Sequence, residues 1–193
     1  MLPNLEKYRI VLASQSPRRR ELLKGLNIPF ETATIDVEET YPDNLSDAEI
    51  PCFLAEKKAN AYTLNEDTLL ITADTIVWLD NTVYGKPRDK ADAVAMLKKL
   101  SGKTHRVITG ICIRTIGKQK TFSVVTNVRF AAITDEEIEY YLENYQPYDK
   151  AGSYGIQEWI GYVAVESIEG SYFNVMGLPI QRLYSELKAI VRC

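Results

Sequence analysis

The sequence has little of what several common functional classes require. It holds a single histidine, His105, so any Ser-His-Asp or Cys-His catalytic scheme would have to use that residue. Its three cysteines, Cys52, Cys112 and Cys193, are widely spaced, which fits neither a disulfide framework nor a zinc knuckle. We therefore expect reduced thiols, no zinc site and a structural His105, because the alternating run around it is typical of a strand.

Long apolar runs and a basic surplus are also lacking. No stretch approaches the roughly 18 consecutive apolar residues that a membrane span needs, and no signal-peptide pattern is present. Lys and Arg total 23 against 26 Asp and Glu, which gives a net charge of −3 and no basic stripe for nucleic acid. These absences predict a cytoplasmic protein without membrane or nucleic-acid partners. The oligomeric state stays open, and a homodimer is compatible with the sequence.

The pattern of apolar residues predicts an α/β fold. With 193 residues and 46% hydrophobic composition, the chain can bury a sizeable core, and we interpret residues 1–193 as one domain. Apolar runs predict buried strands at 8–13 and 69–73, and alternation predicts a hairpin of 104–115 with 121–130. Residues 31–50 resemble an exposed loop, and a strand is expected near 162–165. The sheet is therefore expected to be mixed and partly antiparallel.

Capping residues and helical spacing predict the helices. Ser16 and Pro17 mark the start of a first helix, and a second helix runs from about Ser46 or Pro51 to Leu64. Three more are expected at about 89–100, 134–146 and 180–190, the second of them opened by the capping box of Thr134 and Glu137.

The turn after the first strand carries an unusual concentration of positive charge. Arg18 and Arg19 lie in the first turn of a helix, where the positive end of the helix dipole disfavours cations. An anion would explain them, because free N–H groups, the hydroxyls of Ser14 and Ser16 and two guanidinium groups would converge on it. The alternative is a solvated basic turn that Arg20 continues.

Two further charged residues stand in apolar surroundings. Lys58 points between Leu54 and Tyr62 on the apolar face of the second helix, so it either reaches outward to solvent or binds an anion. Asp74 follows the predicted strand 69–73, and the carboxyl end of a strand in an α/β sheet is where ligands gather. A carboxylate there could hold a divalent ion or accept a proton from water. The alternative for Asp74 is a turn or capping residue.

Two loops are weaker candidates. Residues 85–89 (GKPRD) place Lys86 and a second cation before a helix that Asp89 could cap. Gly152, Gly155 and Gln157 could bring backbone and one amide close to a base, although a loop that needs positive φ angles would use glycine as well.

These motifs occur in an order that resembles a known family. LASQSPRRRELL, LAEKKA, ADTIV, GKPRD, LSGKTHRVITG, DKAGSYGIQ and GSYFNVMGLP span residues 12 to 179 and are together similar to the Maf family of nucleotide pyrophosphatases. The resemblance implies an α/β fold of two lobes with a central cleft, related to that of the inosine triphosphate pyrophosphatases. It also implies hydrolysis of a nucleoside triphosphate to the monophosphate and pyrophosphate.

The resemblance also assigns roles to residues. Asp74 is similar to the family's proton acceptor and Glu39 to a carboxylate that joins it in holding Mg²⁺ or Mn²⁺. The catalytic and phosphate-handling positions are matched by Ser14, Arg18, Arg19, Lys58 and Lys86. Thr72 is bulkier than the small residue expected before Ala73 and Asp74.

Three positions indicate the substrate. Arg18, Thr75 and Gln157 resemble the branch that acts on dTTP and UTP rather than on 7-methyl-GTP. A modified pyrimidine nucleotide is a further substrate candidate. The alternative function is a regulator of septum formation that binds nucleotides without hydrolysing them.

Overall fold

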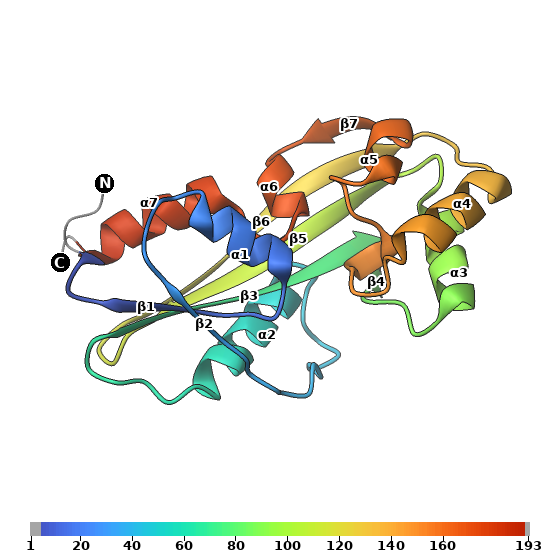
Figure 1. Ribbon diagram of the computed structural model, residues 1–193. Helices are drawn as coiled ribbons and strands as arrows, with labels where there is room; N and C mark the ends of the chain where they lie inside the picture. The colour runs from blue at the N-terminus through green and yellow to red at the C-terminus, as the bar shows by residue number, and fades with distance from the viewer. Residues whose placement is uncertain (1–4, 192–193) are drawn as a thin grey trace. The chain divides into compact units, whose positions relative to one another are not determined.

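The fold is a mixed α/β arrangement around one twisted sheet, seen in a computed structural model that describes residues 5–191 (Figure 1). The sheet has the strand order β2-β1-β3-β5-β6-β7, with β4 paired to β3. Strand β1 is parallel to β2 and β3, whereas β4 and β7 are antiparallel to their partners. In chain order the elements are β1 (Arg9–Ala13), α1 (Pro17–Lys24), β2 (Glu31–Ala33), α2 (Glu49–Asn60), β3 (Thr68–Leu79), β4 (Thr82–Tyr84), α3 (Lys90–Leu100), β5 (Thr104–Arg114), β6 (Gln119–Phe130), α4 (Asp135–Tyr145), the 3-10 turn η2 (Ala151–Ser153), α5 (Trp159–Val163), β7 (Val165–Glu169), α6 (Tyr172–Val175) and α7 (Ile180–Val191).

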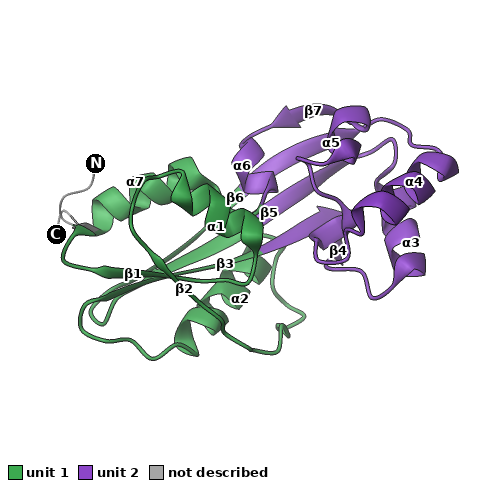
Figure 2. Ribbon diagram, in the orientation of Figure 1, with its two compact units in different colours: residues 1–74, 109–124, 177–193 green, residues 75–108, 125–176 purple. Residues whose placement is uncertain are grey.

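The chain divides into two compact units, each assembled from segments that are distant in sequence (Figure 2). Unit 1 comprises residues 1–74, 109–124 and 177–193, and unit 2 comprises residues 75–108 and 125–176. The predicted mixed, partly antiparallel sheet is confirmed. No helix within residues 5–191 combines the length and apolar character needed to cross a membrane.

Unit 1 is built around the parallel strands β2, β1 and β3. Figure 1 shows α1 and α7 on one face of these strands and α2 on the other. Small residues allow α2 to pack closely: a Cβ on Gly110 of β5 would lie 2.2 Å from the carbonyl carbon of Pro51, so only glycine fits there. The apolar side chains between α2 and the sheet are those of Val11, Ala13, Ala55, Ala59, Leu70 and Cys112.

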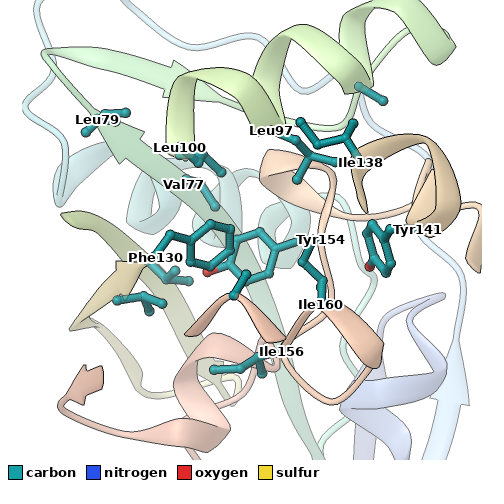
Figure 3. Packing of buried hydrophobic residues seen from close by; sticks show 14 of the residues in the cluster. Val77, Leu79, Leu97, Leu100, Phe130, Ile138, Tyr141, Tyr154, Ile156 and Ile160 are labelled. Atoms are coloured by element: carbon teal, nitrogen blue, oxygen red, sulfur yellow. The ribbon is translucent and has the colours of Figure 1, made fainter. Parts of the chain in front are cut away.

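Unit 2 has its own apolar core between its part of the sheet and helices α3, α4 and α5 (Figure 3). The rings of Phe130 and Tyr154 meet edge to face in this core, with centroids 4.9 Å apart. His105 contacts both rings and is 1% exposed. Helix α4 begins with the predicted capping box, in which Thr134 and Glu137 each satisfy the other's backbone N–H.

Most predicted elements are present, but four boundaries were wrong, and three of them lie outside β3. Residues 31–33 were assigned to an exposed loop, yet they form β2, a short edge strand that pairs with β1 without an apolar pattern of its own. Helix α2 ends at Asn60, before the predicted Leu64. Tyr162 and Val163 belong to α5, and the following strand begins at Val165.

The boundary that matters most for function lies in β3. A strand was predicted to end at Ala73, with Asp74 after it, but β3 continues without interruption from Thr68 to Leu79. The prediction failed because Asp74 is 7% exposed and ion-paired, so a charged residue here does not mark a turn. The reason for expecting a ligand still holds, because β1 pairs with β3 only as far as Leu12 with Ile71, and Asp74 lies beyond that point.

Candidate active site

The N-terminus of α1 places the positive end of a helix dipole close to two arginines. Ser16 is the predicted N-cap, with its Oγ accepting from the Arg19 N–H at 3.5 Å, and Pro17 occupies the first turn. The Ser14 Oγ in turn accepts from the Ser16 N–H at 3.2 Å. The first turn contains no acidic residue, so no carboxylate in that turn offsets the positive end of the helix dipole. An incoming anion would be stabilised there.

Arg19 binds the protein backbone at two points. Its Nε donates to the Gly177 carbonyl and one terminal nitrogen, Nη1, to the Ala73 carbonyl, each at 2.8 Å. Burial lowers the pKa of Arg19, while the charge of nearby Asp74 opposes that shift. Arg19 therefore fixes the backbone next to Asp74, a role that the sequence did not indicate, and it brings positive charge to the same place.

Lys58 connects the two carboxylates that the sequence singled out. Its Nζ donates to Asp74 Oδ1 at 2.6 Å and to Glu39 Oε1 at 2.8 Å. The Lys58 side chain is 13% exposed and that of Glu39 is 45% exposed. The structure thus excludes the solvent-reaching alternative for Lys58, and it brings together three of the predicted residues within unit 1.

The two oxygens of Asp74 differ in their surroundings. Within residues 5–191, Oδ1 accepts the bond from Lys58, and no hydrogen bond joins Oδ2 to the protein. Desolvation by burial raises the pKa of Asp74, partly offset by the charges of Lys58 and Arg19. A carboxylate with one unoccupied oxygen and increased basicity is suited to accepting a proton.

The donors present fit a divalent cation of the kind predicted. Glu39 and Asp74 supply carboxylate oxygens, and both already converge on one positive group, the Lys58 ammonium. The described part of the chain contains no cluster of three or more His, Cys, Asp or Glu side chains. Mg²⁺ is commonly held by one or two carboxylates together with substrate phosphates, so two carboxylates are enough ligands from the protein.

The remaining predicted residues lie in unit 2. Thr75 follows Asp74 in β3 and is half-buried, and Lys86 is exposed in the loop between β4 and α3. The Gln157 Oε1 is buried without a hydrogen-bond partner in the described part of the chain. Their assigned roles stay predictions.

Asp89 and His105 have the structural roles that the sequence predicts. Asp89 caps α3, as proposed, with its side chain accepting from the Asp92 N–H at 2.8 Å. His105 is a buried strand residue whose Nε2 lies 2.7 Å from the Tyr154 hydroxyl, and burial lowers its pKa to about 4.

The fold and the site together define a class: an α/β protein in which an arginine-rich helix N-terminus lies near a buried, lysine-paired carboxylate. The sequence model of the family described as "Maf-like protein" matches residues 9–190. The chain therefore belongs to the Maf family, as its motifs predicted.

Relatives of the chain carry a consistent name. A dTTP/UTP pyrophosphatase from Phocaeicola vulgatus is 63% identical, with 98% of this chain and 100% of that protein aligned. The proteins of the same name from Porphyromonas gingivalis strain W83 and Flavobacterium johnsoniae are 56% and 51% identical, with 97% of this chain and 97% of each protein aligned. Among solved structures, a HAM1 protein from Coxiella burnetii is 16% identical and covers 94% of this chain and 99% of its own, with a TM-score of 0.52. This likeness confirms the fold.

Proposed function

We propose that the protein hydrolyses dTTP and UTP to the nucleoside monophosphate and pyrophosphate. The observation that carries the proposal is Asp74, a buried carboxylate with one oxygen bonded to Lys58 and the other without a hydrogen-bond partner among residues 5–191. The names of relatives that are 51% to 63% identical over nearly the whole chain support the same activity.

In the proposed reaction, a water oxygen forms a bond to the α-phosphorus while the bond from that phosphorus to the oxygen bridging to the β-phosphate breaks. Asp74 Oδ2 takes the proton of the water, and pyrophosphate leaves with the bridging oxygen. The helix N-terminus, Ser14 and Arg18 bind phosphate oxygens, while Arg19 and Lys58 add positive charge near Asp74. The predicted role of Lys86 is likewise to stabilise phosphate charge.

A divalent cation belongs to this proposal. Glu39 and Asp74 are the residues that would hold Mg²⁺ or Mn²⁺. The cation would neutralise phosphate charge when bound. Protein residues supply the remaining functions: Arg19 fixes the backbone before Asp74, and Lys58 orients Oδ1.

Gln157 supports a pyrimidine substrate. Its buried Oε1 is an acceptor without a donor in the described part of the chain, and the N3–H of thymine and uracil is a donor. Cytosine presents an acceptor at the same ring position, so a Gln157 oxygen would favour dTTP and UTP over CTP. Modified uracil or thymine nucleotides that keep N3–H remain within the proposed substrate class.

A pyrophosphate-release assay tests the proposal. The purified protein is given dTTP, UTP, CTP, ATP, GTP and 7-methyl-GTP with Mg²⁺ or Mn²⁺, and kcat/KM is compared. We expect dTTP and UTP to exceed the others by at least about tenfold. In water enriched in ¹⁸O, the label should enter the monophosphate, which identifies the α-phosphorus as the atom attacked.

Three results would contradict the proposal: no release from any triphosphate, release of orthophosphate, or label in the pyrophosphate. Tight nucleotide binding without release would instead support the regulatory alternative. The cytoplasmic location and the homodimer stay predictions.

A further inference from the structure

Thr72 makes a hydrogen bond that links the two elements carrying the ion pair. It is fully buried in β3, and its Oγ1 donates to the Ala55 carbonyl of α2 at 2.7 Å. Strand β3 also carries Asp74, and α2 also carries Lys58. The hydroxyl therefore joins the same strand to the same helix as the ion pair does.

The hydrogen bond and the ion pair lie next to each other. Residues 72 and 74 of a strand point to the same face, about 7 Å apart along it. Ala55 and Lys58 are neighbours on one face of α2, about 4.5 Å apart along the helix axis. The Thr72 hydrogen bond therefore fixes the position of α2 along β3 close to the place where Lys58 contacts Asp74.

The start of α2 is fixed by a different contact. Gly110 of β5 approaches Pro51 so closely that a Cβ there would lie 2.2 Å from the Pro51 carbonyl carbon. This contact restrains how near α2 comes to the sheet but makes no directional bond. The hydrogen bond of the Thr72 hydroxyl adds a restraint on the orientation of α2, because hydrogen bonds weaken steeply when their angle is distorted.

Packing alone does not require threonine at this position. In an α-helix, the Ala55 carbonyl is already the acceptor for the N–H of Ala59, so it needs no further donor. A valine has the same shape and would fill the same space without burying a hydroxyl. Threonine is larger than the residue expected at position 72. What distinguishes it from valine is the hydrogen bond that its hydroxyl makes to the Ala55 carbonyl.

We propose that Thr72 is a positioning residue, whose bond to the Ala55 carbonyl sets α2 so that Lys58 Nζ stays on Asp74 Oδ1. Oδ2 is then left to face the reacting water. The catalytic consequence rests on the proposed pyrophosphatase activity. The geometric consequence, the placement of Lys58 on Asp74, does not.

The kinetic test compares Thr72→Val with Thr72→Ser. Loss of one buried hydrogen bond corresponds to about a tenfold change, so Thr72→Val should lower kcat for dTTP about tenfold with little change in KM. Thr72→Ser keeps the hydroxyl and should recover most of the rate. Thr68→Val is the matched control: Thr68 is equally buried in β3, accepts from the Asn65 N–H at 3.2 Å, and should retain kcat.

A double-mutant cycle tests whether Thr72 acts through Lys58. In a Lys58→Met background, Thr72→Val should cost less than about twofold, because the contact it positions is already lost. A further tenfold loss in that background would overturn the proposal, and so would a Thr72→Ser enzyme as slow as Thr72→Val.

Crystal structures of the wild type, Thr72→Val and Thr72→Ser give a test that needs no activity. We expect the contact between Lys58 Nζ and Asp74 Oδ1 to lengthen only in Thr72→Val. An unchanged contact in that variant would overturn the positioning role, whether or not the wild type releases pyrophosphate. A wild type that releases none would contradict the proposed function alone.

Discussion

The two units each contain a lysine shared by two carboxylates. In unit 1, Lys58 binds Asp74 and Glu39; in unit 2, Lys150 binds Asp149 at 2.8 Å and Glu158 at 3.0 Å. Both lysines are largely buried, and each has one partner carboxylate that is more buried than the other: Asp74 is 10% and Glu158 19% exposed, against 45% for Glu39 and 55% for Asp149. By residue type and burial alone, the two clusters would be taken for equivalents.

They differ in how completely the buried carboxylate is bonded. Glu158 accepts from Lys150 at Oε1 and from the Tyr141 hydroxyl at Oε2, and that hydroxyl accepts from the Gly155 N–H at 2.9 Å. Asp74 accepts from the protein at one oxygen only, within the described residues. A carboxylate whose two oxygens both accept hydrogen bonds from the protein stabilises the conformation of its loop. A carboxylate with one such oxygen retains the other to accept a proton.

The largest effect is expected from Asp74→Asn. The amide cannot accept the proton of water, so kcat should fall at least about 1,000-fold while triphosphate binding is kept. The free energy of unfolding at neutral pH should not fall, because the substitution removes a buried carboxylate whose pKa is raised. Pyrophosphate release, nucleotide titration and urea unfolding measure the three quantities. Unchanged turnover would show that another residue is the base.

The next effect separates the two lysines. Lys150→Met removes the cation from Glu158, which is only partly exposed, so it should lower the free energy of unfolding by about 3 kcal/mol. Lys58→Met should lower kcat about 100-fold but cost less stability, because Asp74 can take up a proton. Urea unfolding and steady-state kinetics of both variants measure this contrast. If Lys58→Met proved the more destabilising of the two, the comparison would fail.

The smallest effect at neutral pH concerns His105, a group of unit 2 whose pKa is shifted by burial. Burial lowers its pKa from 6.5 to about 4, so the unfolded chain binds a proton that the folded chain does not. Stability should therefore be unaffected above about pH 6.5 and should fall by about 3 kcal/mol by pH 4. His105→Gln should remove this part of the pH dependence in urea unfolding.

The same residue gives a direct check by NMR. The chain contains one histidine, so the imidazole signal is assigned without ambiguity. A titration midpoint near 6.5 would contradict the predicted burial effect.

The sequence carried enough information for the fold class and for the identity of several site residues. Lys58 was conspicuous because a lysine lay in an apolar stripe, and Arg18 and Arg19 because cations stood at a helix N-terminus. In each case the residue type is unusual for its position in the predicted helix, and this can be recognised from a single sequence. The family resemblance then gave the residues their roles.

Long-range contacts could not be predicted in this way. Nothing in the pattern around Arg19 indicates the Ala73 and Gly177 carbonyls that it binds. The sequence indicates only the size of Thr72 and not its hydrogen bond, because a threonine in a buried strand follows the same pattern as any other β-branched residue. The sequence analysis also does not single out Glu158, although a charged residue next to Gln157 in a glycine-rich loop is an available signal.

The contacts of Arg19 have a consequence for how the protein matures during synthesis. Arg19 must find a carbonyl 158 residues further along the chain before the backbone around Asp74 is fixed. Unit 2 ends at residue 176, so all of its segments have been synthesised before the segment that contains Gly177. A growing chain can thus complete unit 2 while unit 1 still lacks its last part. The reactive carboxylate acquires its full set of restraints only when the chain is nearly finished.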